Sequence, residues 1–294
     1  MVEITNNIAE AKLITHSGTF HPDDVFSTTF LLKLYPNSKI IRVKEVKEVN
    51  KDQIVYDIGY GKFDHHGTDT KWRNNKIKYS SFGLLWEYYG RDYLKDITEE
   101  YEDVWERIDT KLVSQIDGID NGNFPTIIAD YELLDLDHII DLYNNNWDDN
   151  TNNDLNFLKA VNCATEIFDN LIKREIANSK ACKKVLEKIK NTPGEILYLD
   201  EYMPYEEALF SNNSSNIKAI IYPAKRGGYN IKPVTISKES KELKYNFPKE
   251  WWGLHDQELA DKSGIKTARF IHSTGFIAVT DNIEDAYLLS DKLS

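Results

Sequence analysis

Two short segments of the chain concentrate residue types that bind metal ions and transfer protons. The first runs His16-Ser-Gly-Thr-Phe-His21-Pro-Asp23-Asp24, and the second contains Asp57 followed by Asp64-His65-His66. Four of the chain's seven histidines therefore fall within 51 residues, each of them near carboxylates. Because an apolar core does not require such side chains, their co-occurrence indicates a catalytic or metal-binding site.

Carboxylates combined with imidazoles are ligands of divalent ions such as Mg²⁺ and Mn²⁺. A two-metal site for phosphoryl chemistry needs one carboxylate that bridges the ions and further ligands on each ion. Asp57 suits the bridge, because Gly59 and Gly61 follow it and let other backbone approach closely. Further ligands would come from His16, His21, Asp23, Asp24 and His65, and from a carboxylate of the segment Asp117-Gly-Ile-Asp120.

Each of these fragments alone also has a purely structural interpretation. Asp57 could simply end a strand, and Asp23 or Asp24 could cap the following helix. Asp117 or Asp120 could likewise be a turn residue at the end of a helix. The order His, Asp-Asp, Asp, Asp-His-His, Asp along one chain is what favours a metal site.

The elements around these segments predict an α/β fold. Strands are predicted from apolar, β-branched runs at residues 11–15, 39–43 and 53–58. Helices are predicted at residues 24–35, 82–89 and 98–115. Strands that alternate with helices are typical of a mainly parallel sheet flanked by helices, and ligands bind at the carboxyl ends of its strands. His16 and Asp57 both fall at predicted strand ends.

The C-terminal part of the chain has a different pattern. An Asn- and Asp-rich loop at 141–154 precedes a long helical pattern that ends at Asn191-Thr-Pro-Gly194. Beyond it, strand-forming runs at 195–199, 217–222 and 229–236 predict a smaller α+β domain. We therefore predict two domains, residues 1–190 with the metal site and the connecting helix, and residues 191–294.

Composition excludes several classes of protein. The net charge of −12 argues against a protein that coats long nucleic acids, and 41% hydrophobic residues are typical of a globular chain. Cys163 and Cys182 are too few for a disulfide framework. Since no apolar run has the length of a membrane span and the N-terminus lacks signal-peptide features, we expect a cytoplasmic protein without membrane partners. The oligomeric state stays open, a homodimer included.

The order of the motifs resembles that of the Asp-His-His (DHH) phosphoesterase superfamily, and more closely its melanocyte-proliferating-gene (Myg) protein family. Besides the two segments above, the resemblance is carried by Ser80-Ser81-Phe-Gly83, Ile116 to Gly122, Phe247 to Leu254, Ser263-Gly264-Ile and Phe270 to Phe276. It spans essentially the whole chain. Members of this family are described as metal-dependent 3′→5′ RNA exonucleases.

The resemblance implies roles for individual residues of the first domain. The metal ligands would be His16, the pair Asp23 and Asp24, Asp57, His65 and Asp117, with His21 and Asp120 as alternatives to His16 and Asp117. His66 would donate a proton to the leaving oxygen or contact the phosphate, and Asp64 would orient an imidazole.

In the second domain, the resemblance implies a substrate-binding end at His272, Ser273 and Gly275. Lys225 and Arg226 could form a hairpin turn or contact phosphate. Trp251, Trp252 and Phe270 could belong to the core or stack on bases.

We therefore expect a metal-dependent phosphodiesterase with two Mn²⁺ or Mg²⁺ ions that activate a water, acting as a 3′→5′ exoribonuclease on short single-stranded RNA. One alternative is a small-molecule phosphohydrolase whose substrate is a nucleotide, a cyclic dinucleotide or pyrophosphate. Another is a regulatory protein that binds metal without turnover.

Overall fold

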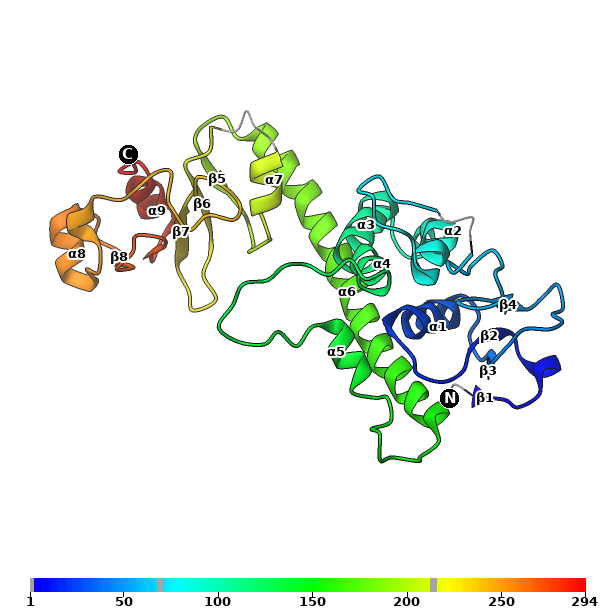
Figure 1. The fold of residues 1–294 in the computed structure, drawn as a ribbon. Helices are drawn as coiled ribbons and strands as arrows, with labels where there is room; N and C mark the ends of the chain where they lie inside the picture. The colour runs from blue at the N-terminus through cyan, green and yellow to red at the C-terminus, as the bar shows by residue number, and fades with distance from the viewer. Residues whose placement is uncertain (1–2, 68–70, 212–215) are drawn as a thin grey trace. The chain divides into compact units, whose positions relative to one another are not determined.

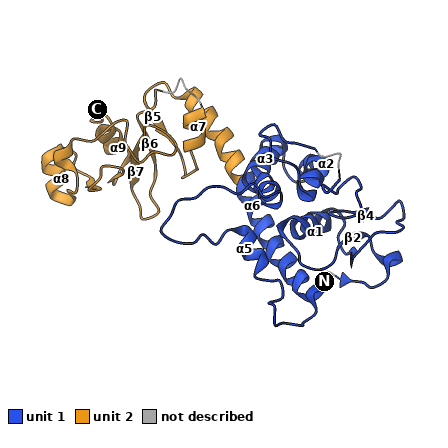
Figure 2. Ribbon diagram, in the orientation of Figure 1, with its two compact units in different colours: residues 1–176 blue, residues 177–294 orange. Residues whose placement is uncertain are grey.

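The structure is a computed structural model that describes residues 3–67, 71–211 and 216–294. The chain forms two compact units, residues 1–176 and residues 177–294 (Figure 2). The boundary between them falls within the long helix α6 (Asn153–Asn191). The domain limits predicted from the sequence put the boundary at the end of this helix instead, and they stay a prediction.

The first unit is built on a four-stranded parallel sheet with the strand order β1-β3-β2-β4 (Figure 1). Its strands are β1 (Glu3–Ile4), β2 (Leu13–His16), β3 (Lys39–Val43) and β4 (Ile54–Val55). Ile14 pairs with Val55, so the residues after β4 lie beside the end of β2. The three strands predicted in this region are therefore present, while β1 is too short to give a sequence pattern.

Helices pack around this sheet and form the core of the unit. They are α1 (Pro22–Leu34), α2 (Ser81–Lys95), α3 (Tyr101–Ile108), the π-helical segment η2 (Asp109–Val113), α4 (Ser114–Asp120), α5 (Leu136–Asp141) and α6, preceded by the short 3₁₀ helix η1 (Ile8–Glu10). The ring of Phe30 lies 5.3 Å from Trp86 and 6.0 Å from Phe168, which joins α1 to α2 and α6. All residues from Pro22 to Leu31 are buried, as expected for a helix covered on every side.

The second unit contains a five-stranded mixed sheet with the order β5-β6-β7-β9-β8. Its strands are β5 (Ile196–Tyr198), β6 (Ala219–Pro223), β7 (Tyr229–Pro233), β8 (Ala268–Ile271) and β9 (Ala278–Thr280). Its helices are α7 (Glu206–Ser211), η3 (Lys249–Trp251), α8 (Asp256–Ser263) and α9 (Ile283–Ser290). The predicted α/β class with a parallel sheet flanked by helices is confirmed, and the second sheet is a mixed one. None of the helices in the described part of the chain has the length and apolar character needed to cross a membrane.

The N-terminus of α2 is held by side chains from two distant segments. The Asp23 carboxylate accepts hydrogen bonds from the backbone N–H groups of Ser81 and Phe82, at 2.9 and 2.6 Å. The Ser81 hydroxyl donates to Asp57 at 3.2 Å. The first N–H groups of a helix have no partner within the helix and favour negative charge, so this end of α2 stabilises both carboxylates.

Asp117 holds the same helix from the other side. One of its oxygens accepts hydrogen bonds from the N–H and the hydroxyl of Ser80, at 3.0 and 2.7 Å. The other oxygen pairs with Arg73, which also binds both oxygens of Asp109. Asp117 is fully buried beside Gly83, where an added Cβ would overlap its carboxylate oxygens. Glycine at position 83 is therefore required by the close approach of Asp117 to α2.

We expect Gly83→Ala to lower the free energy of unfolding by about 1–3 kcal/mol, because the added methyl group must displace the Asp117 carboxylate or the helix. Gly61→Ala is the matched control, since an added Cβ there meets nothing within 4 Å. Thermal or urea unfolding of both variants measures the difference. Equal stabilities of the two variants would contradict the proposed contact.

Candidate metal centre

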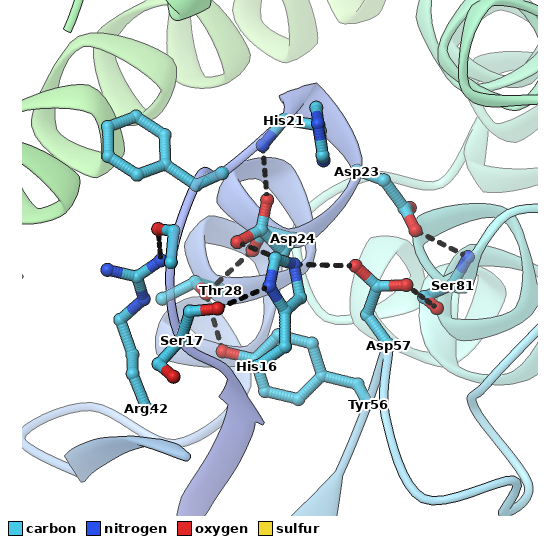
Figure 3. A network of polar contacts seen from close by, with 12 residues as sticks. His16, Ser17, His21, Asp23, Asp24, Thr28, Arg42, Tyr56, Asp57 and Ser81 are labelled. Atoms are coloured by element: carbon cyan, nitrogen blue, oxygen red, sulfur yellow. Dashed lines mark hydrogen bonds and ion pairs between the residues drawn. The ribbon is translucent and has the colours of Figure 1, made fainter. Parts of the chain in front are cut away.

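His16, His21, Asp23, Asp24 and Asp57, which were singled out in the sequence, lie close together at the carboxyl edge of the parallel sheet (Figure 3). His16 is the last residue of β2, and Asp57 follows β4 by two residues. Asp23 and Asp24 lie in the first turn of α1, where the backbone N–H of His21 donates to Asp24 at 2.8 Å. The ends of two strands and the start of one helix therefore position these four side chains.

Asp57 lies at the centre of the cluster. Its Oδ2 atom is 3.2 Å from Nε2 of His16, and its Oδ1 atom is 3.3 Å from Nε2 of His65. The side chain is only 5% exposed, and its φ of 54° is left-handed, which is uncommon for a residue other than glycine. Because each oxygen faces a different imidazole, this carboxylate has the arrangement that a ligand bridging two ions requires.

The first group of donor atoms consists of His16, His21 and Asp24, which offer ligand atoms within 4.8 Å of one another. Oδ2 of Asp24 is 3.4 Å from Nε2 of His16. The same Oδ2 atom is buried and has no hydrogen-bond partner among the described residues.

The second group consists of Asp23, His65 and Asp120, again with ligand atoms within 4.8 Å of one another. Nε2 of His65 is 3.1 Å from Oδ2 of Asp120 and 3.9 Å from Oδ2 of Asp23. In the described part of the chain, Oδ2 of Asp120 also lacks a hydrogen-bond partner. A third group, Asp57 with His65 and His66, overlaps the second.

The residues of these groups fit a divalent cation. A buried carboxylate oxygen without a donor is costly, and Asp24 and Asp120 each have one that faces an imidazole. A cation between the donor atoms would satisfy both oxygens. The donor set consists of carboxylate oxygens and imidazole nitrogens, which suits Mn²⁺ and, for the carboxylates, Mg²⁺.

The imidazoles and carboxylates of the cluster shift one another's pKa values. Burial acts to lower the pKa of His16, but the hydrogen bond to Asp57 and the charges of Asp57 and Asp24 raise it to about 9. Burial raises the pKa of Asp24 to about 6 despite the opposing charge of His16. Burial also acts to raise the pKa of Asp57, yet hydrogen bonds from His16 and His65 outweigh it and hold that pKa well below its usual range. The cluster thus holds positive charge at the places where cations would bind.

Asp117, which the sequence analysis placed in the ligand set, lies outside these three groups. Its oxygens face Ser80 and Arg73, and Asp120, one helical turn later, reaches His65 instead. The sequence did not decide whether Asp117 or Asp120 faces the candidate metal site. The two differ because Arg73 pairs with Asp117, and a contact between residues 44 positions apart leaves no local pattern in the sequence.

Asp64 and His66 contact each other directly. Oδ1 of Asp64 is 2.7 Å from Nδ1 of His66 and accepts the backbone N–H of His66 at 3.0 Å. Nδ1 of His66 is also 3.7 Å from Oδ1 of Asp57. The geometry is that of a carboxylate that orients an imidazole beside a metal site.

The residues singled out in the second unit lie in turns of its sheet. Lys225 and Arg226 belong to the turn between β6 and β7. His272, Ser273 and Gly275 lie between β8 and β9, where Gly275 has a φ of 72° and packs against Trp252. Whether they bind substrate stays a prediction.

A cavity of about 920 Å³ opens onto the cluster in the first unit. His16, His21, Asp57, His65, His66 and Asp120 all line it. Lys44, which follows β3, and the aromatic residues Tyr60 and Phe124 also border it.

Comparison with known proteins identifies the family. Residues 12–293 match the MYG1_exonuc family, described as an uncharacterised protein family (UPF0160). The chain belongs to this family.

Curated relatives match the chain over most of its length. A MYG1 protein of Dictyostelium discoideum is 29% identical over 97% of both chains, and one of Saccharomyces cerevisiae is 26% identical over 97% of this chain and 96% of its own. A mouse relative named MYG1 exonuclease is 27% identical over 92% of this chain and 82% of its own. No solved structure matches the chain. The predicted relationship to Myg proteins is confirmed, and the link to the DHH superfamily stays a prediction.

The contrast between Asp120 and Asp117 tests the ligand set of this family member. We expect Asp120→Asn to lower the affinity for Mn²⁺ by about 10-fold or more while the protein without metal stays folded. Asp117→Asn should instead cost about 1–3 kcal/mol of stability, because Arg73 and Ser80 lose a buried charged acceptor while Arg73 keeps Asp109. Calorimetric Mn²⁺ titration and unfolding curves measure the two effects. The opposite pattern would return Asp117 to the ligand set.

Metal affinity should rise with pH. A histidine binds a metal ion only in its neutral form, so an ion must displace the proton of His16 at any pH below about 9. Affinity for Mn²⁺ should therefore increase by about tenfold per pH unit for each proton released, level off above the pKa of His16, and fall more steeply below about 6, where Asp24 also binds a proton. Titrations in buffers of different ionisation enthalpy measure the released protons. An affinity that does not change between these two pH values would contradict the ligation by His16.

Proposed function

We propose that this protein is a metal-dependent phosphodiesterase that removes nucleotides from the 3′ end of short single-stranded RNA. The observation that carries the proposal is the position of Asp57, whose two oxygens face two different imidazoles in a shared cluster of carboxylates. The MYG1 family, with a mouse member named an exonuclease, supports a nuclease-like activity. The preference for RNA, the direction of cleavage and the mechanism are our proposal.

Two of the donor groups lie on either side of Asp57, which contacts His16 of one group and His65 of the other. His16, His21 and Asp24 would hold one ion, and Asp23, His65 and Asp120 would hold the other. Two divalent ions supply two things in phosphodiester hydrolysis, a lowered pKa for the attacking water and neutralisation of charge on the phosphate.

The protein's own proton donor in this proposal is His66. Asp64 pairs with Nδ1 of His66 and holds the ring in one orientation. Nε2 of His66 is then the nitrogen that can exchange a proton with the leaving oxygen of the substrate. The His66 side chain is 55% exposed, so a substrate in the cavity can reach it.

The size and charge of the cavity favour a short strand that enters by its end. Its volume of about 920 Å³ is in the range of sites that enclose one small ligand, which fits a terminal nucleotide better than a duplex. Lys44 at its border offers a cation for a phosphate in a protein whose net charge is −12. The same volume suits a small-molecule phosphohydrolase, so the substrate must be tested directly.

A short 5′-labelled oligoribonucleotide incubated with Mn²⁺ tests the function. We expect the wild type to produce a ladder of products that shorten from the 3′ end, and Asp57→Asn to produce none. The rate of His66→Gln should be lower than that of the wild type by a factor of about 100 or more, because this variant lacks the proton donor. A chelator should abolish cleavage. The matched control is His138→Gln, because His138 pairs with Asp135 on the surface and lies outside the cluster.

Other outcomes would favour the alternatives. An intact oligonucleotide together with hydrolysis of nucleotides, cyclic dinucleotides or pyrophosphate would establish a small-molecule phosphohydrolase. Metal-dependent thermal stabilisation without hydrolysis of any phosphoester would indicate a regulatory protein. Equal ladders from the wild type and Asp57→Asn would place the active site elsewhere.

A further inference from the structure

Tyr60 presents an uncovered aromatic ring at the border of the metal-centre cavity. The residue is 79% exposed. It lines the cavity of about 920 Å³ and also a second one of about 620 Å³, and His65 and His66 line both. Among the residues that the structure describes, no ring or cation contact involves the Tyr60 side chain. Packing therefore does not explain an aromatic residue here.

Tyr60 also has a backbone conformation that is unfavourable for residues other than glycine. Its φ of 57° is left-handed, and it lies between Gly59 and Gly61. A residue with a Cβ atom pays about 1–2 kcal/mol in this conformation, and glycine does not. Burial of the ring does not offset this cost, because the side chain is exposed. A large aromatic residue held in a strained position beside a catalytic cluster points to a functional role.

One carboxylate fixes Tyr60 relative to the proposed proton donor. The backbone N–H of Tyr60 donates to Oδ2 of Asp64 at 2.5 Å, and Oδ1 of the same carboxylate pairs with Nδ1 of His66 at 2.7 Å. The Asp64 side chain is only 1% exposed, so its carboxylate has a fixed position between the two partners. The Asp64 carboxylate therefore fixes the backbone of Tyr60 relative to the His66 ring. Nδ1 of that ring is 3.7 Å from Oδ1 of Asp57.

We propose that Tyr60 stacks on the base of the nucleotide next to the scissile phosphate, an inference that rests on the proposed function. A phosphodiester placed between the metal cluster and His66 brings its adjoining nucleoside to the border of the cavity, where the exposed ring lies. Stacking on an aromatic face is tolerant of sequence because every base has a π face. The enzyme would thus select nucleic acid over simple phosphodiesters without selecting particular bases.

The test combines a side-chain change with a base deletion. The substrates are a short oligoribonucleotide and a set of copies that each carry one abasic residue near the 3′ end. With the wild type, one abasic position should raise KM by about 10-fold or more and leave kcat nearly unchanged. With Tyr60→Gly, KM for the intact strand should rise by a similar factor, and removal of the same base should have no further effect.

Three controls separate stacking from a structural effect. Tyr60→Phe keeps the ring without the hydroxyl and should behave as the wild type. Tyr60→Gly should be at least as stable as the wild type in thermal unfolding, because glycine relieves the left-handed strain. Tyr131→Gly removes a tyrosine that is 73% exposed but lines neither cavity, and should leave KM unchanged.

The outcomes distinguish the stacking from the proposed function. Cleavage by Tyr60→Gly with an unchanged KM, or with the same sensitivity to base deletion as the wild type, would overturn the stacking and leave the function standing. Loss of stability in Tyr60→Gly would assign Tyr60 a structural role and also overturn it. A wild type that cleaves none of these strands would overturn the proposed substrate class and the stacking with it.

Discussion

The crowding of carboxylates around Asp57 is the constraint on which the rest of the first unit depends. Asp23, Asp24, Asp57 and Asp120 all face the same cluster, and burial raises the pKa of Asp23, Asp24 and Asp120. Two kinds of positively polarised group offset the repulsion between these carboxylates. The start of α2 donates N–H groups to Asp23 and a hydroxyl to Asp57, and the imidazoles of His16 and His65 pair with Asp57. The helix start and the histidines thus keep the site assembled for cations.

The same constraint also limits the sequence and position of α2. Asp23 contacts its first N–H groups, Asp117 contacts Ser80 immediately before it, and Gly83 leaves space for the Asp117 carboxylate. Asp117 itself is balanced by Arg73, so it acts as a structural charge one turn away from Asp120. A buried arginine pairs with Asp117, whereas Asp120 faces His65. Two aspartates of one short helix therefore have different partners.

The sequence was sufficient for features that depend on local pattern. The strands that end at His16 and near Asp57 are apolar and β-branched, so the position of both residues at one sheet edge follows from parallel-sheet topology. Features that depend on distant partners were not predictable in this way. Neither the contact of Asp23 with α2 nor the pairing of Asp117 with Arg73 leaves a local signal, and β1 has only two residues. Tertiary pairing, rather than propensity, decides these cases.

The short loop after β4 shows where local rules and function diverge. Asp57 and Tyr60 both adopt left-handed backbone conformations that favour glycine, and glycines flank Tyr60 on both sides. The strain at Asp57 is balanced by contacts, since its carboxylate meets His16, His65 and Ser81. The strain at Tyr60 has no such balance within the described chain, because only its backbone N–H is held, by Asp64. The surrounding fold, through Asp64 and the turn that leads to His65, therefore holds Tyr60 in this conformation, while its ring stays exposed at the border of the cavity.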